Sequence, residues 1–138
     1  MPDPPVTVLD SYAVLALFGA EAGSDQVQAI LRDAEEGRAC VCMSQINLGE
    51  VLYIAERERG LPAAQRALAT IEQLPIELMP ATRERILQAA HIKATANLSY
   101  PDAFAAAAAS ELKGSVLTGD PEFAEVENMI SVTWLPRE

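Results

Sequence analysis

Short apolar runs alternate along this chain with longer segments of helical periodicity, and this alternation limits the folds open to it. Each run is rich in Val, Ile or Leu and is bounded by Gly, Pro, Ser or Asp, as buried strands usually are. The runs predicted as strands are 6–9, 39–43, 76–79, 115–117 and 132–135. Because parallel strands need long crossovers, strands alternating with helices predict an α/β domain with a mainly parallel sheet.

Several of the predicted crossovers hold two helices. The segments predicted as helices are 12–20, 25–36, 45–59, 62–74, 82–96 and 101–112. Gly-Leu-Pro at 60–62 separates one helix pair, and Asn-Leu-Ser-Tyr-Pro at 97–101 separates another, since Gly ends helices and Pro starts them. With no repeat and no linker, the chain is predicted to be one domain, 1–138, folded as a three-layer α/β/α sandwich around about five strands.

The charge balance excludes a broadly basic surface for nucleic acid, because 20 acidic residues oppose 10 basic ones and the net charge is −10. Three sources of positive charge remain open: divalent cations held by the carboxylates, a basic partner chain, and the local pairs Arg57 with Arg59 and Arg83 with Arg85. The chain has neither an 18-residue apolar run nor a signal-peptide pattern. We therefore expect a cytoplasmic protein without a membrane segment.

Two cysteines, Cys40 and Cys42, stand one residue apart in a predicted strand. Their side chains point to the same face, which is a poor geometry for a disulfide between them, so two buried thiols are expected. A structural zinc ion takes about four ligands, and the only other soft ligand, His91, has no suitable spacing to the pair. The sequence therefore does not predict a zinc site.

Two aspartates are placed where a parallel sheet would bring them together, and a third opens a predicted helix. Asp10 follows the first predicted strand directly, and Asp120 comes within three residues of the fourth. The carboxyl ends of parallel strands form the crevice where α/β proteins bind ligands, so both side chains are expected at that edge. Asp102 stands at the start of the alanine-rich helix that leads into the fourth strand.

Glu50 is the unusual acid of the third predicted helix. Its helical neighbours Ile46, Tyr53 and Ile54 put it on a face suited to burial. A buried carboxylate needs a hydrogen bond, a proton or a metal ion. Pairing with Arg57 is the structural alternative.

The aspartates also have structural alternatives. Asp10 and Asp120 could each cap the turn or helix that follows a strand, a common use of Asp. Ser99 and Asp102 have the spacing of a capping box, in which the carboxylate complements a helix N-terminus. The functional interpretation therefore rests on the four acids as a set.

Such a set favours metal-assisted hydrolysis. Mg²⁺ takes oxygen ligands, and divalent ions lower the pKa of bound water and stabilise the transition state of phosphodiester cleavage. A Ser-His-Asp triad is not evident, because His91 lies in the middle of a predicted helix without a nucleophile. The chain also lacks a Gly-rich phosphate loop.

Four segments, in this order and spacing, resemble the PIN-domain ribonucleases, and specifically the VapC-type toxins of bacterial toxin-antitoxin pairs. They are 8–16 (VLDSYAVLA), 44–51 (SQINLGEV), 99–108 (SYPDAFAAAA) and 117–123 (LTGDPEF). The resemblance implies an endoribonuclease that prefers single strands and leaves a 5′-phosphate, with Mg²⁺ or Mn²⁺ held by Asp10, Glu50, Asp102 and Asp120. It also implies that Thr118, Ser11 and Asn47 support the metal site.

The same resemblance implies a homodimer that a small cognate antitoxin neutralises. Two other α/β families place an Asp after the first strand, the haloacid-dehalogenase-like phosphatases and the receiver domains. The first needs an Asp where this chain has Tyr12, and both need a lysine near the last strands that is missing here. The alternative that remains is a PIN-like scaffold that binds RNA or a partner without cutting.

Overall fold

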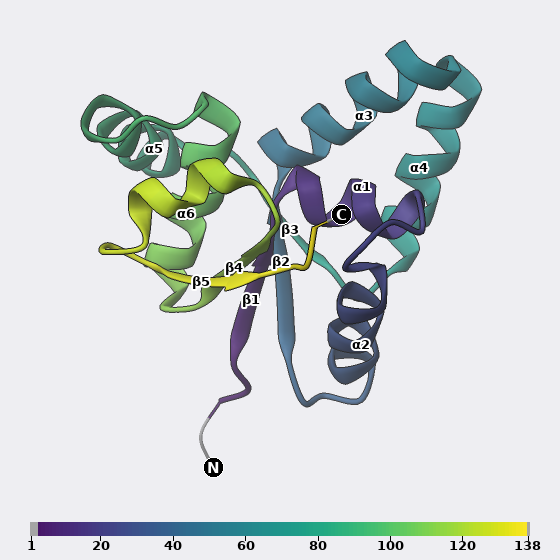
Figure 1. The fold of residues 1–138 in the computed structure, drawn as a ribbon, viewed down its shortest axis with the longest axis horizontal. Helices are drawn as coiled ribbons and strands as arrows, with labels where there is room; N and C mark the ends of the chain where they lie inside the picture. Colours follow the sequence, from purple (N-terminus) through teal and green to yellow (C-terminus); the bar gives the residue numbers. More distant parts are fainter. Residues whose placement is uncertain (1–2, 138) are drawn as a thin grey trace.

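A five-stranded, entirely parallel sheet forms the centre of the computed structural model, which describes residues 3–137 (Figure 1). The strands are β1 (Val6–Leu9), β2 (Cys40–Ser44), β3 (Glu77–Met79), β4 (Ser115–Thr118) and β5 (Ser131–Trp134). Their order across the sheet is β3-β2-β1-β4-β5, and each neighbouring pair is parallel. The predicted fold class is confirmed, and each predicted strand lies within one residue of its observed bounds.

Two helices connect β1 to β2, two connect β2 to β3, and two connect β3 to β4. They are α1 (Ser11–Phe18), α2 (Ser24–Glu35), α3 (Gln45–Arg59), α4 (Leu61–Gln73), α5 (Arg83–Thr95) and α6 (Tyr100–Leu112). A short 3₁₀ helix, η1 (Pro121–Val126), joins β4 to β5 and was not predicted, because six residues are too few for a helical pattern to appear. Within residues 3–137, each helix is too short or too polar to cross a membrane.

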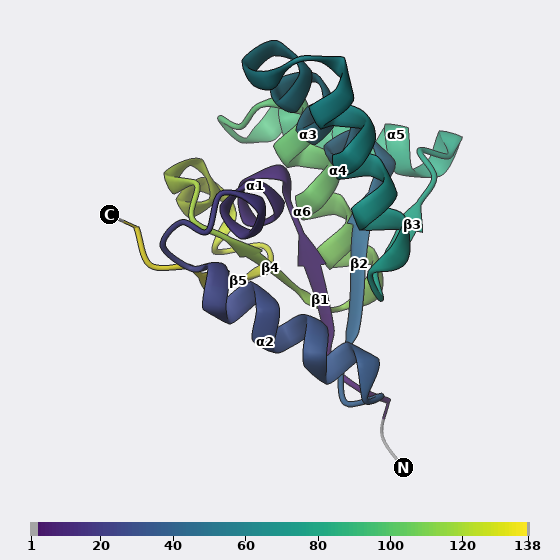
Figure 2. The same ribbon diagram turned by 90° about the vertical axis from the view of Figure 1, so that its right-hand side faces the viewer.

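The helices cover both faces of the sheet and make the three layers that the sequence predicts (Figures 1 and 2). Val8 and Val116 face a core shared with α5 and α6, whereas Leu9 and Leu117 face a core shared with α1, α2, α3 and α4. This alternation follows from the two-residue period of a strand.

The alanine-rich helix α6 lies close against the sheet. All five alanines of the run 105–109 are buried, because α6 packs between β1, β2 and β4 on one side and α5 on the other. Small side chains allow this close approach. It brings the first turn of α6, which carries Asp102, near the carboxyl ends of the strands.

The order of the strands places a crevice beside β1. The chain runs outward from β1 through β2 to β3 on one side, and it returns through β4 and β5 on the other. Ligands of open α/β sheets bind where the strand order reverses in this way. Asp10 follows β1 and Asp120 follows β4, so both stand at this point.

Candidate metal centre

Asp10 is held at the end of β1 by two hydrogen bonds. One carboxylate oxygen accepts the backbone N–H of Ala13 at 2.9 Å and so caps α1, and the other accepts the hydroxyl of Thr118 at 2.5 Å. The side chain is 1% exposed. Burial raises the pKa of Asp10 to about 7; the two hydrogen bonds oppose this shift, while the charges of Asp120 and Glu50 add to it.

Thr118 connects Asp10 to Asp120. Its buried hydroxyl donates to Asp10 and accepts the backbone N–H of Asp120 at 2.9 Å. One carboxylate oxygen of Asp120 accepts the N–H of Glu122 at 2.9 Å and caps η1. The loop between Thr118 and Asp120 needs glycine at position 119, because a Cβ there would lie 2.4 Å from a ring carbon of Tyr12.

Asp102 lies in the first turn of α6 and is 5% exposed. The cap of this helix is Ser99, whose hydroxyl accepts the backbone N–H of Asp102 at 3.2 Å. Burial raises the pKa of Asp102 to about 8, and the charges of Asp120, Asp10 and Glu50 add to this shift. A hydrogen bond with Ser99 lowers the pKa and so opposes the shift. Asp102 is therefore not itself the helix cap, and its carboxylate belongs to the acidic cluster.

Glu50 reaches the same cluster from α3. One of its carboxylate oxygens accepts the hydroxyl of Ser11 at 2.5 Å, and its charge acts on both Asp10 and Asp102. The alternative pairing with Arg57 is not among the ion pairs of the described residues, and Arg57 instead lies over the ring of Tyr53. Ser11 thus contacts one of the four acids, and its support of a metal site stays a prediction.

Asn47 stands one turn before Glu50 and is fully buried. Its side-chain amide donates to the carbonyl of Pro101 at 3.0 Å and so ties α3 to the start of α6. The other amide atom, Oδ1, has no hydrogen-bond partner within the described part of the chain. Asn47 therefore contacts the backbone beside Asp102, and within the described residues its side chain makes no hydrogen bond to a carboxylate.

Glu122 is a candidate site residue that the sequence did not indicate. Carboxylate oxygens of Asp102, Asp120 and Glu122 all lie within 4.8 Å of one another, a spacing that suits ligands of one ion. Asp10 and Glu50 do not belong to this compact group, although their charges act on it. Its place in the sequence could have indicated it, because Glu122 follows Asp120 by two residues in a turn that begins with proline.

The structural and functional interpretations of Asp10 and Asp120 prove compatible. Each aspartate caps the element that follows it with one carboxylate oxygen. The second oxygen of Asp10 is held by Thr118. Capping therefore fixes the orientation of these carboxylates and does not compete with their place in the cluster.

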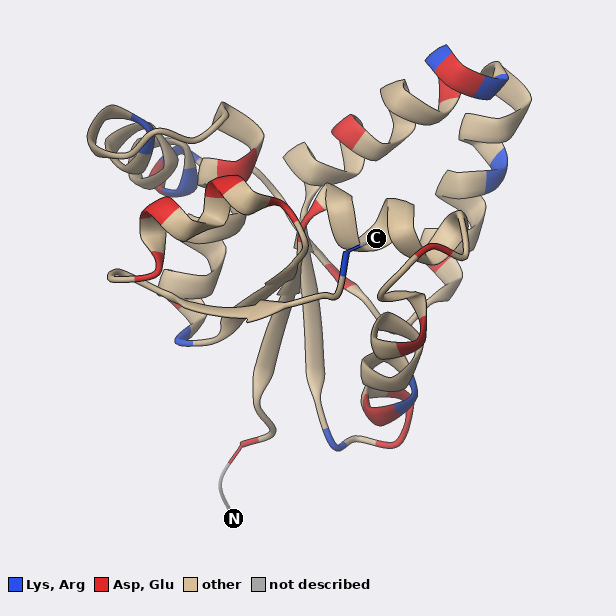
Figure 3. Ribbon diagram, viewed as in Figure 1, with Lys and Arg blue, Asp and Glu red and all other residues tan. Residues whose placement is uncertain are grey.

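The cluster lacks a basic partner among residues 3–137. The ion pairs described there join Arg38 to Asp33 and Glu36, and Arg85 to Glu111, all away from the crevice. Figure 3 shows acidic residues around the strand ends at the centre of the molecule. Carboxylates gathered without basic partners take up protons or bind cations, and an all-oxygen ligand set suits a hard divalent ion.

The two basic pairs of the sequence differ in availability. Arg85 donates twice to the carboxylate of Glu111, at 3.0 Å each, and once to the carbonyl of Pro80 at 2.9 Å. Its charge is therefore engaged within the fold. Arg57 lies at the far end of α3, with its guanidinium 5.2 Å from the ring centre of Tyr53.

A comparison with known sequence families shows which family this chain belongs to. The family of the PIN domain matches residues 7–129. The chain belongs to the PIN-domain family. A comparison with curated protein sequences gave no significant match.

Solved structures share the fold of this PIN domain. VapBC2 from Rickettsia felis, bound to a promoter DNA fragment, is 12% identical with a TM-score of 0.73, over 95% of this chain and 99% of that one. Mycobacterium tuberculosis VapC20, a sarcin-ricin loop cleaving toxin, is 19% identical with a TM-score of 0.70, over 95% and 99%. DNA-bound VapBC from Salmonella typhimurium is 20% identical with a TM-score of 0.67, over 94% and 97%.

Proposed function

We propose that this PIN domain is a Mg²⁺- or Mn²⁺-dependent endoribonuclease and the toxin of a type II toxin-antitoxin pair. The observation that carries the proposal is the convergence of Asp10, Glu50, Asp102 and Asp120 at one sheet edge without a basic partner among the described residues. VapC20, which has the same fold, is a sarcin-ricin loop cleaving toxin.

Each acid has a distinct part in this proposal. Asp102, Asp120 and Glu122 supply the compact ligand group, and Asp10, oriented by Thr118, adds a carboxylate beside it. A divalent ion bound there supplies Lewis-acid chemistry and a water of lowered pKa. Glu50, oriented by Ser11, extends the acidic edge from α3.

Helix starts add to the affinity for a phosphate. The N-termini of α1 and α3 follow directly on the ends of β1 and β2, and α6 begins close to Asp102 (Figure 1). A helix N-terminus carries partial positive charge and free N–H groups, which favour anions. These ends offset part of the acidity that opposes RNA binding.

The proposed partners are RNA and a small antitoxin. A groove of about 490 Å³ between α1, α3 and α4 joins apolar side chains such as Leu15, Phe18 and Ile54 with the guanidinium groups of Arg59 and Arg66. The same groove holds Glu21 and Glu58, so an antitoxin segment with apolar side chains and charges of both signs would match this lining. The homodimer, the single-domain organisation and the cytoplasmic location stay predictions.

The deciding experiment is cleavage of a mixed single-stranded RNA with and without Mg²⁺ or Mn²⁺. We expect metal-dependent cleavage that Asp10→Asn abolishes and Asp25→Asn retains, since Asp25 is an exposed aspartate of α2. Cleavage that continues unchanged in Asp10→Asn would place the active site elsewhere. RNA that is retained but never cut would favour the binding scaffold instead.

The toxin role has its own test. Expression should stop growth, and co-expression of the cognate antitoxin should restore it. The Asp10→Asn variant should be harmless at the same expression level. A wild-type chain that never slows growth and never copurifies with a small protein would contradict the toxin role.

A further inference from the structure

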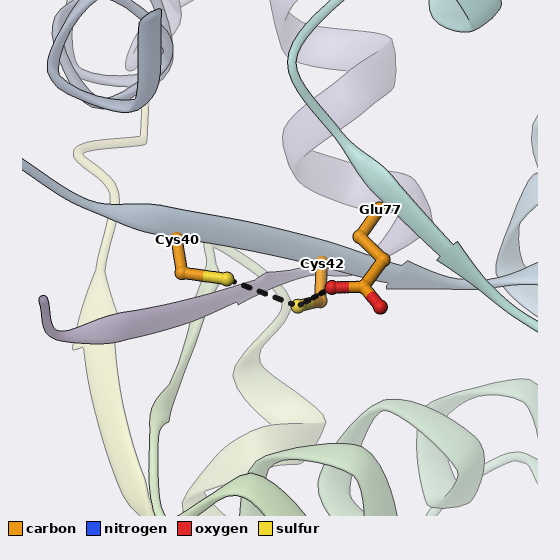
Figure 4. A group of neighbouring side chains, drawn as sticks. All are labelled: Cys40, Cys42 and Glu77. Carbon is orange, nitrogen blue, oxygen red and sulfur yellow. Dashed lines mark hydrogen bonds between the residues drawn. The ribbon is translucent and has the colours of Figure 1, made fainter. Parts of the chain in front are cut away.

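Three potential ligands meet on the α5 and α6 side of the sheet, outside the carboxylate cluster (Figure 4). Cys40 and Cys42 lie on the same face of β2, and Glu77 opens β3, where it pairs with Cys42. The two Sγ atoms are 3.9 Å apart, and Cys42 Sγ is 3.9 Å from Glu77 Oε2. One ligand atom from each residue lies within 4.8 Å of the other two.

We propose that Cys40, Cys42 and Glu77 form a binding site for a thiophilic divalent cation of the zinc class, separate from the carboxylate centre. The site lies toward the amino end of β2, beside Val6 and Val8 of β1, whereas the carboxylate centre begins beyond the carboxyl end of β1.

The distances fit a tetrahedral ion. Two thiolates bound to one ion at about 2.3 Å lie about 3.8 Å apart, close to the separation of these sulfur atoms. A carboxylate oxygen bound at about 2.1 Å would lie about 3.6 Å from each sulfur, so Glu77 needs only a small shift. The three side chains already point toward one another (Figure 4). Binding therefore demands little rearrangement.

Burial leaves an ion access to the three ligands, whereas the metal-free site holds Cys42 as a thiol, because burial and the neighbouring Cys40 and Glu77 raise the pKa of Cys42 to about 12. Cys42 is 2% exposed, Cys40 is half-buried, and Glu77 is exposed, so an ion has a path from the surface and an open fourth position for water. Each thiol gives up its proton on binding, so two protons are released per ion. The guanidinium of Arg85 feels the charges of Glu77 and Cys42 and offsets part of the remaining negative charge.

The ligand chemistry separates this site from the carboxylate centre. Thiolates select soft or borderline ions such as Zn²⁺ and Cd²⁺, whereas an all-carboxylate set favours Mg²⁺ or Mn²⁺. An ion held here would join β2 to β3, the three-residue strand at the edge of the sheet. The sequence could not reveal this site, because the third ligand comes from the neighbouring strand.

The test is a titration of the reduced full chain with Cd²⁺, followed by the near-ultraviolet absorption of cadmium-thiolate bonds. We expect one ion per chain, two protons released, displacement by Zn²⁺, and no displacement by excess Mg²⁺. Cys40→Ser should weaken binding by at least about 100-fold, because even the loss of an outer-shell partner costs 10- to 100-fold. Glu77→Gln should weaken it less and keep the thiolate absorption.

Two controls make the result decisive. Asp102→Asn removes a carboxylate of the other centre and should leave the cadmium-thiolate band unchanged. Circular dichroism verifies that each variant is folded. A third ligand variant, Cys42→Ser, alters a buried side chain; if it does not fold, Cys40→Ser and Glu77→Gln decide the matter. A missing thiolate band in the wild type, or an equal affinity in Cys40→Ser, would overturn the proposal.

Discussion

The hydroxyl of Thr118 donates to the carboxylate of Asp10 across 108 positions of the chain, and this bond joins the end of β4 to the end of β1. Thr118 is fully buried, so its hydroxyl has no access to water as a substitute partner. The same oxygen accepts the backbone N–H of Asp120. One hydroxyl therefore sets the positions of two acids of the centre.

Replacing Thr118 with Val keeps the shape and removes both hydrogen bonds. We expect the free energy of unfolding to fall by about 1–3 kcal/mol, because the N–H of Asp120 is left without its partner. Mg²⁺ affinity should fall as well. Urea unfolding and calorimetric titration measure the two effects. Thr133→Val, at an exposed threonine of β5, is the control, and an equal loss there would contradict the argument.

The stability of the metal-free protein should decrease with rising pH. Folding raises the pKa of Asp10 to about 7 and that of Asp102 to about 8, so between their ordinary value of 3.8 and these values the folded chain binds more protons than the unfolded one. The stabilisation is therefore complete below about pH 4 and is lost as the pH rises through 7 to 8. Each pH unit below the folded pKa is worth about 1.4 kcal/mol for each group, so we expect a loss on the order of 7 kcal/mol between about pH 5 and about pH 8.5.

Urea unfolding across this pH range measures the slope, with EDTA present to remove metal ions. Saturating Mg²⁺ should flatten the slope, because metal binding favours the ionised carboxylates. The double variant Asp10→Asn with Asp102→Asn should also be nearly flat. Stability that rises over this range in the metal-free wild type would mean that both carboxylates are ionised in the fold.

Asp102→Asn should stabilise the metal-free protein while it abolishes metal-dependent activity. The amide cannot ionise, so folding needs neither the uptake of a proton below the pKa of about 8 nor, above it, a buried charge that Asp120, Asp10 and Glu50 repel. At neutral pH and above, we expect a gain of about 1–2 kcal/mol, the usual size of such exchanges between stability and activity. Thermal unfolding with EDTA checks the gain, and Asp25→Asn should change little. A destabilised Asp102→Asn would speak against charge repulsion at this position.

Gly119→Ala should displace the loop that carries Asp120. A Cβ at Gly119 would lie 2.4 Å from the ring of Tyr12, and overpacking of this kind costs about 1–3 kcal/mol. Gly49→Ala is the matched control, because nothing lies within 4 Å of its Cβ and alanine favours the helix by about 0.5–1 kcal/mol. Adding Tyr12→Ala should recover activity in Gly119→Ala. No recovery would place the damage elsewhere.

The elements of this fold were predictable from the sequence because two independent signals agree at their ends. Short apolar runs bounded by Gly, Pro or Asp mark the strands, and polar caps such as Ser44, Thr82 and Ser99 mark the helix starts. The segment η1 has neither a long period nor an apolar face, since only Phe123 and Val126 are buried in it. Tertiary packing, and not local pattern, therefore defines it.

The acids of the centre were predictable to different degrees. Asp10 and Asp120 follow from the geometry of parallel strands, and Glu50 from its place on a helix face fit for burial. Glu122 was missed because an exposed acid in a turn carries no pattern of its own. Glu77 was missed for another reason, since register between β2 and β3 decides that it lies beside Cys42.

The pairing of β4 with β1 sets the moment in protein synthesis at which the centre is complete. While β1, β2 and β3 with their helices leave the ribosome, the growing chain holds Asp10 and Glu50 without Thr118 and Asp120. The four acids meet only after residue 120 has emerged. For an RNA-cleaving activity, this delay means that the growing chain carries no finished catalytic centre until residue 120 has left the ribosome.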